Sequence, residues 1–558
     1  MSRLPLLGAS AARDPAAPLA WRAGRPVSTG RFVAAAEALA ERLPPHGQPV
    51  NLCQDRLNFA IAWAAALLRG QASLMPPNAL PATLRALPAL DSAGAPVYAL
   101  ADEAGLDAGG LAVIEVGALP AHERGAVPQL DAELEAVCLL TSGSTGAPTP
   151  HAKRFGPLTL NIAAEAERLA ELLGVPDLGG LNIVATVPPQ HSYGFESSVL
   201  LALLGGAAFD AGRPFYPADI AAALAALPRP RALVTTPVHL KALLGAGIEL
   251  PATELVLSAT APLAPQMAAQ AEVALGGRLV EIYGCTEAGQ VAARRTTAGE
   301  RWTTLGALRI TQQEGGDDGE RFIVSGGHVT EATPLADVLE LDPEGSDEAG
   351  ARHFHLLGRA NDLIHVAGKR SSLAHLNFHL NRIEGVHDGA FWLPDEAPGE
   401  VARTVAFVVA PTLDARAVVD ALRGHVEPAF LPRRVVPVAA LPREATGKLT
   451  AAALRAFAIE TLGIERSFTV AVDHPAFAGH FPGRPVLPGA VLLSLVLEEV
   501  LREPALADKV GRAPRVEQAK FLAPVGPGER LVLTLKGTAF EVRAGARAVL
   551  RGHFGSAA

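Results

Sequence analysis

The chain of 558 residues is poor in cysteine and lacks any long, uninterrupted apolar run. Its three cysteines, Cys53, Cys138 and Cys285, are far apart and without metal-ligand spacing, which favours a reducing compartment and argues against structural zinc. The longest apolar run, 199–209, contains two glycines and is too short to span a bilayer. The N-terminal segment lacks the apolar core of a signal peptide. We therefore expect a cytoplasmic protein without a membrane span.

Basic residues are also in deficit, and lysine is rare among them. The 57 acidic residues outnumber the 48 lysines and arginines, giving a formal net charge of −9. The composition therefore does not show the excess of basic residues typical of nucleic-acid-binding proteins. Only seven of those 48 residues are lysines. Two of the seven, Lys153 and Lys448, follow glycine-containing loops where a compact ammonium group suits phosphate chemistry. Their positions favour a functional role over a solvated surface position.

The chain is rich in apolar residues, and these are arranged in alternating elements. Hydrophobic residues make up 49% of the sequence, and the length predicts roughly two to four domains. Strands are expected at 182–187, 232–236, 254–258 and 278–283, and helices at 31–42, 58–69 and 218–227. This alternation predicts an α/β protein with a doubly wound, largely parallel sheet.

A loop rich in hydroxyl groups and glycine follows a predicted strand at 135–140. It consists of Thr141, Ser142, Gly143, Ser144, Thr145 and Gly146. Glycine reaches positive φ at no steric cost, so backbone N–H groups of such a loop can point inward and bind anionic oxygens. The loop does not match the P-loop motif GxxxxGK[ST], and a surface linker is the alternative interpretation. Because α/β sheets bind ligands at the carboxyl ends of strands, we expect this loop to bind polyphosphate.

Further motifs follow in a fixed order. They are PPQHSYG at 188–194, SATAPL at 258–263, EIYGCTE at 281–287, TPLAD at 333–337 and GRAND at 358–362. With the loop, they resemble the adenylate-forming superfamily of acyl-CoA synthetases, carrier-protein ligases, nonribosomal adenylation domains and luciferases, over roughly residues 30–460. Three places depart from the residues usual in this superfamily and indicate that the chain belongs to a divergent branch of it: Thr149, Ala259-Thr260 and Leu335-Ala336.

The resemblance implies a large domain, 1–358, that binds ATP and Mg²⁺. The 141–146 loop would wrap the β- and γ-phosphates, with Lys153 adding positive charge. Tyr283 would stack on adenine, and Thr260 would lie in the turn on the other side of the ring. Further implied contacts are those of Thr286 with the α-phosphate, Glu287 with Mg²⁺, Asp337 and Arg359 with the ribose, and His191 and Gly284 with the acyl group.

The segment 359–461 resembles the small, mobile α+β domain of the superfamily, which rotates as a lid between two catalytic poses. Asn361 stands at the usual hinge aspartate. LPREATGK, at 441–448, matches the loop that delivers the catalytic lysine. Lys448 would bridge the attacking carboxylate and the α-phosphate, neutralising charge that grows in the transition state.

The reaction implied by the resemblance has two steps. A carboxylic acid and ATP give an acyl-adenylate and pyrophosphate, and the acyl group then passes to a pantetheine thiol. We find no serine-bearing carrier domain in the chain, so an acyl carrier protein would supply the thiol in trans. Two alternatives stay open: an aryl or fatty acyl-CoA ligase, and a non-catalytic scaffold that binds carrier proteins.

The C-terminal segment, 466–558, carries a second set of motifs after a predicted linker at 462–467. GHFPGRPVLPG, at 479–489, precedes an apolar helix expected at 490–501, and strands are expected at 515–521, 530–535 and 547–554. This pattern resembles the α+β hot-dog fold of 3-hydroxyacyl-carrier-protein dehydratases. Hot-dog domains usually pair, so the resemblance also implies a homodimer.

In that family the histidine of HFP is the general base, a role that falls to His480 here. The Gly489 amide would polarise the thioester carbonyl at the start of the helix. The position of the family's acid holds Ser494, and Glu498 lies one helical turn beyond it. An active dehydratase and a binding or dimerisation module are both open. The fusion of the two domains resembles proteins of bacterial aryl-polyene pathways, whose ligase would load an aryl acid.

Overall fold

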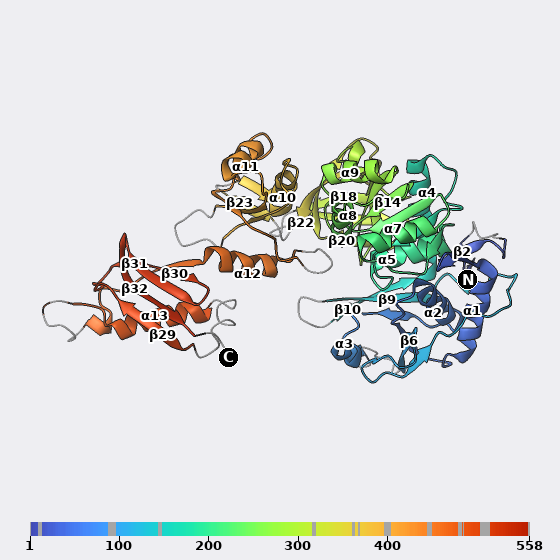
Figure 1. Cartoon of the computed structure of the whole chain (residues 1–558), viewed down its shortest axis with the longest axis horizontal. Helices are drawn as coiled ribbons and strands as arrows, with labels where there is room; N and C mark the ends of the chain where they lie inside the picture. The colour runs from blue at the N-terminus through green and yellow to red at the C-terminus, as the bar shows by residue number, and fades with distance from the viewer. Residues whose placement is uncertain are drawn as a thin grey trace. The chain divides into compact units, whose positions relative to one another are not determined.

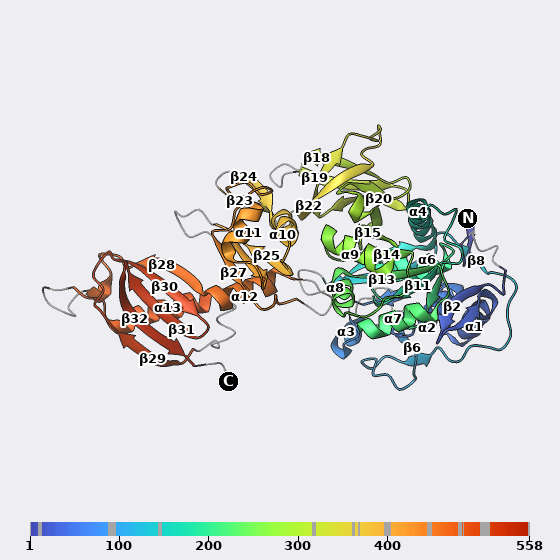
Figure 2. The same cartoon turned by 45° about the horizontal axis from the view of Figure 1, so that its top comes forward.

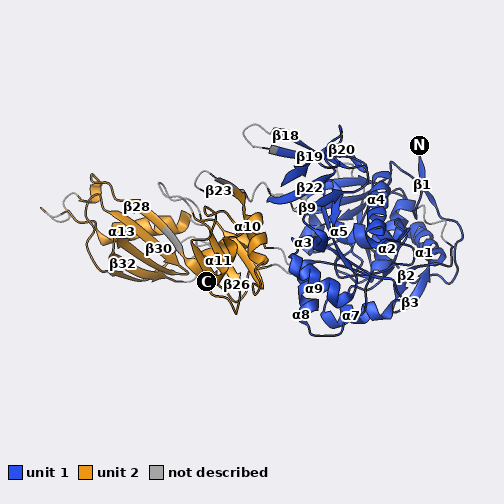
Figure 3. Ribbon diagram, turned by 90° about the horizontal axis from the view of Figure 1, so that it is seen from above, with its two compact units in different colours: residues 1–361 blue, residues 362–558 orange. Residues whose placement is uncertain are grey.

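The chain forms two compact units, Met1–Asn361 and Asp362–Ala558, which Figure 3 shows in separate colours. The computed structural model describes residues 2–8, 14–76, 78–87, 96–142, 148–314, 320–359, 363–366, 369–394, 403–443, 449–477, 483, 485–502 and 514–555. The fold class is the expected mixed α/β arrangement, with a large doubly wound domain and a C-terminal hot-dog domain.

The first unit is built on an 11-stranded sheet whose centre is parallel. The central strands are β12 (Ala208–Asp210), β11 (Asn182–Ala185), β13 (Arg231–Thr235), β14 (Leu255–Ser258) and β15 (Arg278–Cys285). The intervening helices are α7 (Pro217–Ala226), α8 (Pro237–Gly245) and α9 (Pro265–Leu275), labelled in Figure 1. The strands and the helix expected from sequence in this region are confirmed, with bounds that differ by a residue or two.

Both faces of this sheet are apolar because consecutive strand residues point to opposite sides. Leu233, Val256 and Leu279 pack in one core with α7, α8 and α9. The residue after each of them faces the larger core on the other side. Continuous apolar strands of this kind are typical of a parallel sheet covered on both faces.

Antiparallel strands extend the sheet at both edges. Beyond β15 lie β16 (Gly289–Arg294), β17 (Trp302–Thr304), β22 (His353–Arg359) and β21 (Asp337–Asp342), and beyond β12 lie β2 (Pro18–Arg22) and β3 (Arg25–Ser28). A separate three-stranded sheet contains β18 (Arg309–Glu314), β19 (Glu320–Gly326) and β20 (Val329–Leu335). β1 (Arg3–Pro5) pairs with β8 (Gln129–Asp131). The β15–β16 pairing turns the chain back directly after the EIYGCTE motif.

A six-stranded sheet forms the other half of the unit. Its order is β10 (Pro148–Arg154), β9 (Glu135–Ser142), β5 (Ser73–Met75), β4 (Gln48–Asn51), β6 (Val97–Ala101) and β7 (Val113–Glu115). The helices are α1 (Thr29–Arg42), α2 (Arg56–Leu68), α3 (Pro81–Ala86) and α4 (Phe155–Leu173). The antiparallel hairpin β9–β10 flanks the hydroxyl-rich loop, and the helices expected at 31–42 and 58–69 correspond to α1 and α2.

The two halves of the first unit share one large core. Trp63 of α2 packs its ring edge-on to Phe195, with ring centroids 5.5 Å apart, and lies 6.4 Å from Phe155 of α4. Phe195 opens a π-helical segment, η3 (Phe195–Leu200), between α5 (Ser192–Gly194) and α6 (Leu201–Leu203). π-helical turns are rare and are frequent at functional sites. This one follows the HSYG motif directly.

The second unit begins with the small domain predicted as a lid. It has a two-stranded sheet, β23 (Leu363–Val366) with β24 (Lys369–Ser372), and a three-stranded sheet, β25 (Asp388–Trp392), β26 (Val405–Val409) and β27 (Arg434–Pro437). The helices are α10 (Leu373–Asn381), α11 (Ala415–Leu422) and α12 (Ala451–Leu462). The domain is therefore α+β, as the resemblance implies.

The hot-dog domain has one long helix against a five-stranded antiparallel sheet, which Figure 2 shows in the turned view. The strands, in sheet order, are β28 (Ile464–Thr469), β30 (Arg530–Lys536), β31 (Ala539–Ala544), β32 (Arg547–Phe554) and β29 (Val516–Phe521). Helix α13 (Gly489–Arg502) buries Leu492, Val496 and Val500, spaced four apart, in one core with alternate residues of β30.

The linker expected at 462–467 is wrong. α12 runs to Leu462, and β28 begins at Ile464 and pairs with β30 over six residues. Only Gly463 separates the helix from the strand. The polar side chains of this segment favoured a loop, but the pairing with β30, some seventy residues later in the chain, satisfies its backbone as an edge strand.

Candidate active site

The sequence motifs of the first unit meet at one edge of the 11-stranded sheet. His191 follows β11, Thr260 follows β14, and the 283–287 segment ends β15. Because β11, β13, β14 and β15 are parallel neighbours, their carboxyl ends lie side by side. The structure thus brings these residues together, as the sequence predicts.

Tyr283 and Asp337 contact each other directly. The hydroxyl of Tyr283 donates to Oδ2 of Asp337 at 2.7 Å, although the two residues are 54 positions apart. The Tyr283 ring also packs against Trp302 and Phe354, with ring centroids 5.8 and 5.7 Å away. These contacts fix the ring and join the predicted adenine-binding residue to the predicted ribose-binding carboxylate.

Gly284 is glycine for a steric reason. A Cβ atom at this position would lie 2.3 Å from the carbonyl oxygen of Gly289, on the adjacent strand β16. The β15–β16 register shifts at this point. Gly284 is exposed, and it lies beside the turn that carries Thr286 and Glu287.

Thr260 has an unusual backbone. Its φ is +78°, in the left-handed region, where a β-branched residue is strained. The residue is exposed, so its side chain gains little from packing. Backbone strain of about 1–3 kcal/mol is found at functional sites, and Thr260 occupies a turn where the superfamily usually has glycine.

Lys153 lies beside the turn that carries Glu287. From β10 its Nζ donates to the backbone carbonyl of Glu287, and burial lowers the pKa of the lysine. Among the groups that favour its charged form, the buried Glu196 carboxylate has the largest effect. The Nε2 atom of His151 is 3.8 Å from Oε1 of Glu287, whose side chain is 48% exposed. The carboxylate of Glu287 is therefore open to a hard cation.

Behind this edge lies a group of buried polar side chains that the sequence reasoning did not identify. We call it the Glu165 cluster; it contains Asn161 and Glu165 of α4, Tyr193 of α5, Glu196 and Ser197 of η3, and Gln290 of β16. Ser197 Oγ donates to Glu165 Oε1 at 2.8 Å, and Gln290 Nε2 donates to Ser197 Oγ at 2.7 Å. The signal that could have indicated it is Glu196, an acidic residue shortly before the apolar run 199–204.

Arg56 is a second residue that the sequence reasoning missed. Its guanidinium is completely buried and donates to Ser198 Oγ at 2.7 Å and to the carbonyls of Ala185 and Val187 at 3.0 Å each. Burial lowers its pKa to about 10, so it stays cationic at neutral pH. Arg56 thereby ties α2 to the end of β11 and to η3, on either side of His191.

Several predicted site residues lie outside the described residues. These are Gly143, Ser144, Thr145, Gly146, Lys448 and His480, together with the side chains of Thr141, Ser142 and Arg359. Their roles stay predictions.

In the hot-dog domain, Gly489 starts α13 in close contact with an aromatic ring. A Cβ at this position would lie 2.7 Å from Cε1 of Phe521. Ser494 is exposed and donates its hydroxyl to the carbonyl of Ala490 within the helix, at 3.1 Å. Glu498 has a side chain 60% exposed and 3.9 Å from Arg502.

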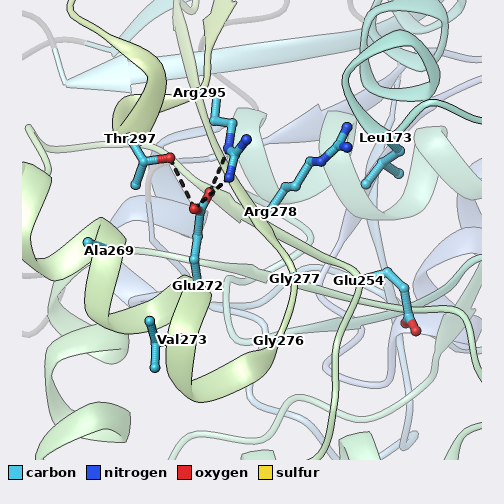
Figure 4. A pocket seen from close by; sticks show the side chains of 10 residues that line it. All are labelled: Leu173, Glu254, Ala269, Glu272, Val273, Gly276, Gly277, Arg278, Arg295 and Thr297. Carbon is cyan, nitrogen blue, oxygen red and sulfur yellow. Dashed lines mark hydrogen bonds and ion pairs between the residues drawn. The ribbon is translucent and has the colours of Figure 1, made fainter.

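A surface hollow near the amino end of β15, shown in Figure 4, is a different feature. Its carboxylate, Glu272, accepts two hydrogen bonds from Arg295, at 2.9 and 2.8 Å, and one from Thr297, at 3.0 Å. The hollow lies at the opposite end of the strand from the motifs. Because Glu272 is paired with Arg295, Glu254 with Arg229, and Arg278 with the carbonyl of Leu172, we interpret the hollow as structural.

Neither a clustered metal site nor a membrane-spanning helix is present among the described residues. No group of three or more His, Cys, Asp or Glu side chains there can hold a metal ion. None of the helices in that part of the chain is long and apolar enough to cross a membrane. A single carboxylate such as Glu287 suits Mg²⁺, which is usually held by one or two carboxylates and by substrate phosphates.

Comparison with known proteins identifies both parts of the chain. The family model described as AMP-binding enzyme matches residues 50–311, and that described as ApeI dehydratase matches 459–554. A 4-coumarate–CoA ligase of Halorhodospira halophila is 30% identical over 322 residues, covering 55% of this chain and 73% of the relative. The chain belongs to the AMP-binding enzyme family.

Other relatives are covered less completely. A 4-coumarate–CoA ligase of Rhodobacter capsulatus is 31% identical over 289 residues, 51% of this chain and 66% of the relative. A 3-hydroxyacyl-acyl-carrier-protein dehydratase of Symbiobacterium thermophilum is 35% identical over 71 residues, 12% of this chain and 50% of the relative. This AMP-binding enzyme thus carries a dehydratase-like hot-dog domain and spans about half the length of the dehydratases it matches.

Solved structures share the fold of the AMP-binding part. Apo MatB from Rhodopseudomonas palustris is 19% identical with a TM-score of 0.61, covering 80% of this chain and 97% of that one. The o-succinylbenzoate-CoA synthetase MenE from Bacillus subtilis, in complex with its acyl-adenylate, is 18% identical with a TM-score of 0.63 and the same coverage. The shared fold confirms the architecture expected for the large domain and lid.

The strain at Thr260 is testable. Thr260→Gly is expected to raise the free energy of unfolding by up to about 1 kcal/mol, because glycine adopts positive φ without a Cβ clash. Thr149→Gly, at an exposed strand position without positive φ, is the matched control and should lower the free energy of unfolding. Urea denaturation followed by fluorescence measures both. An equal loss in the two variants would contradict the strain.

Proposed function

We propose that the chain activates a carboxylic acid with ATP and transfers the acyl group to the phosphopantetheine thiol of an acyl carrier protein. In the first step a carboxylate oxygen bonds to the α-phosphorus and pyrophosphate leaves. In the second step the thiol sulfur bonds to the acyl carbon, AMP leaves and the thiol proton is released. Members of the AMP-binding family are acid–thiol ligases that form AMP. The observation that carries the proposal is the hydrogen-bonded pair Tyr283–Asp337 at the carboxyl end of β15.

The residues at this edge fit ATP and Mg²⁺. Tyr283 offers a fixed aromatic surface for adenine, and Asp337 offers a carboxylate to the ribose hydroxyls, assisted by Arg359. Thr286 would donate to the α-phosphate, and the exposed carboxylate of Glu287 would hold Mg²⁺. When bound, Mg²⁺ neutralises phosphate charge. Solved relatives include MenE in complex with ATP and a magnesium ion.

The other groups act on the phosphates and the acid. The 141–146 loop would cradle the terminal phosphates through its N–H groups and hydroxyls. His191 and Gly284 would border the acyl group, with His191 fixed between two backbone segments held by Arg56. Lys448, carried by the lid, would neutralise charge between the attacking carboxylate and the α-phosphate. Lys153 lies against Glu287 and adds positive charge at the same edge.

An acyl carrier protein is the acceptor we favour over CoA. The fused hot-dog domain resembles enzymes named for acyl-carrier-protein substrates, although the similar ligases are named for CoA. Holo-carrier protein and CoA, offered separately to the purified enzyme, distinguish the two ligases. A scaffold that binds carriers without chemistry would support neither transfer nor acid-dependent exchange.

For the hot-dog domain we propose a binding and dimerisation module. The proposal is supported by Ser494, which stands at the family's acid position and uses its hydroxyl within the helix, and by Glu498, which is exposed beside Arg502. The edge strand β29 ends at Phe521, and this residue and the next one, Leu522, are 50% and 42% exposed. An exposed apolar sheet edge favours pairing with a second copy.

We also propose a cytoplasmic location. Cys53, Cys138 and Cys285 are all free thiols, as a reducing compartment requires.

Lys448→Ala is expected to abolish adenylation while the fold is retained. Loss of a group that neutralises transition-state charge typically costs on the order of 100- to 1,000-fold in rate. Acid-dependent ATP–pyrophosphate exchange measures the step, and circular dichroism checks the fold. Lys536→Ala, at an exposed lysine of β30, is the control and should keep full exchange. Exchange that survives in Lys448→Ala would exclude the catalytic assignment.

The hot-dog assignment predicts that the protein binds a 3-hydroxyacyl carrier protein but does not dehydrate it. Mass spectrometry of the carrier-bound acyl chain would show no loss of water, whereas an active dehydratase of the family, run in parallel, would show it. Enoyl product that disappears in His480→Ala would establish a working dehydratase and refute the module.

A further inference from the structure

Two side chains hold the backbone of the turn that carries Glu287. This turn, 286–288, joins the antiparallel strands β15 and β16. Lys153 Nζ donates to the carbonyl oxygen of Glu287. Nε2 of His328 lies 3.1 Å from the carbonyl oxygen of the next residue, Ala288, which is buried, whereas Glu287 is exposed. The turn is thus fixed through its carbonyl groups while its carboxylate stays accessible.

His328 reaches this turn from a different sheet. It lies in the two-residue turn between β19 and β20, directly after Gly327, whose φ is +53°. Side chains at such connections are usually solvated, but His328 is only 7% exposed. Because a carbonyl oxygen only accepts hydrogen bonds, Nε2 carries the proton and donates to Ala288. A buried donor at the tip of one hairpin thus binds the turn of another.

Gly289, which follows the turn, leaves room for this contact. Its φ is +80°, and a Cβ atom there would lie 3.0 Å from Nδ2 of Asn161 and 3.6 Å from Nε2 of His328. A side chain at this position would crowd Asn161 and strain the backbone. The glycine therefore lets polar side chains of α4 and of the β19–β20 hairpin approach the turn closely.

His328 is bonded to the residue after the proposed metal ligand, so it acts on that ligand through the backbone of the turn. Groups that orient a ligating carboxylate typically change metal affinity 10- to 100-fold when they are replaced. We propose that His328 is a positioning residue, which holds the turn so that the Glu287 carboxylate is oriented toward Mg²⁺. This inference rests on the proposed function.

The test measures how much Mg²⁺ strengthens nucleotide binding, without turnover. Calorimetry gives the Kd of α,β-methylene-ATP in excess Mg²⁺ and in EDTA, and the ratio of the two values is the gain in affinity due to the metal. His328→Phe keeps a ring but removes the donor, and should reduce this gain about 10-fold. The Kd in EDTA should not change, because Tyr283 and Asp337 are held by contacts of their own.

Three further variants complete this experiment. His328→Gln keeps an N–H donor and should retain most of the gain. Thr330→Leu, at an exposed position of β20, is the matched control and should leave the gain unchanged. His328→Leu repeats the comparison with a smaller side chain, so that the test does not depend on the folding of the phenylalanine variant.

An unchanged gain in His328→Phe and His328→Leu would overturn the inference. Equal weakening of nucleotide binding with and without Mg²⁺ would also overturn it, since a general disturbance of the site has that effect. Native protein that binds the analogue without any gain from Mg²⁺ would instead refute the assignment of Glu287 in the proposed function.

A second, independent observation concerns helix α12, which belongs to two cores. Leu454 and Ala458 are buried in the lid core, where the Phe457 ring lies 5.4 Å from that of Phe407. Ile459, the residue after Ala458, is 6% exposed and lies in the hot-dog core with residues of β30. One helix thus joins both domains by apolar contact.

The connection from α12 to the hot-dog sheet is short and closely packed. Gly463 alone separates α12 from β28, and its N–H donates to the carbonyl oxygen of Ile459 at 2.9 Å. A Cβ atom at Gly463 would lie 2.5 Å from the carbonyl oxygen of Leu535 on β30. The next residue, Ile464, is paired with Leu535. A hinge needs residues free to change φ and ψ, whereas the residues of this junction are held by hydrogen bonds and strand pairing.

We infer that the lid and the hot-dog domain form one rigid body, so that any rotation of the lid carries the hot-dog domain with it. Spin labels placed by unnatural amino acids at Arg416 and Glu498, whose side chains are 90% and 60% exposed, report the distance between the two domains. The distance distribution should be narrow and unchanged by an acyl-adenylate analogue. Six Gly/Ser residues inserted after Gly463 should broaden it.

A pair of substitutions in α12 tests the shared core. Ile459→Ser should broaden the distance distribution, because it removes the apolar contact of the helix with the hot-dog core. Ala456→Ser, at an exposed position of the same helix, is the control and should leave the distribution narrow. A broad or ligand-dependent distribution in the native chain would overturn this inference, as would an insertion without effect. The measurement requires no metal, so its outcome is separate from that of the nucleotide-binding experiment.

Discussion

The parallel hydrogen bonding of β11, β13, β14 and β15 is the constraint on which the site depends. It aligns four strand ends at one edge, so that segments nearly a hundred residues apart in the chain become neighbours. Loops at such an edge can carry strained or polar residues because the packed sheet behind them holds the backbone in place. The left-handed Thr260 and the close approach at Gly284 are both found there.

Buried charged side chains also hold the residues at this edge in place. Arg56 satisfies two carbonyls and a hydroxyl around the HSYG segment, and Lys153 favours the ionised form of Glu196. Each cation has hydrogen-bond acceptors or an opposite charge beside it, as an ion removed from water requires. Glu165 resolves the same problem by keeping its proton. The result is a site whose polar groups are oriented before any ligand binds.

The C-terminal half joins two domains through one helix. α12 contributes to both the lid core and the hot-dog core, and the following strand begins after a single glycine. The hot-dog domain therefore follows directly on the last helix of the lid. Ser494, at the family's acid position, accords with the binding module proposed for the hot-dog domain.

Local pattern determined much of this protein. Apolar runs located the central strands, and the ordered motifs located Tyr283, Glu287 and Asp337. Both signals depend only on residues close together in the sequence. Tertiary structure alone decided the rest. The Tyr283–Asp337 bond, the buried positions of Arg56 and Glu165, and the β28–β30 pairing that replaced the expected linker all join residues far apart in sequence. Such contacts depend on which distant segments pack against each other, and a local sequence pattern does not predict that packing.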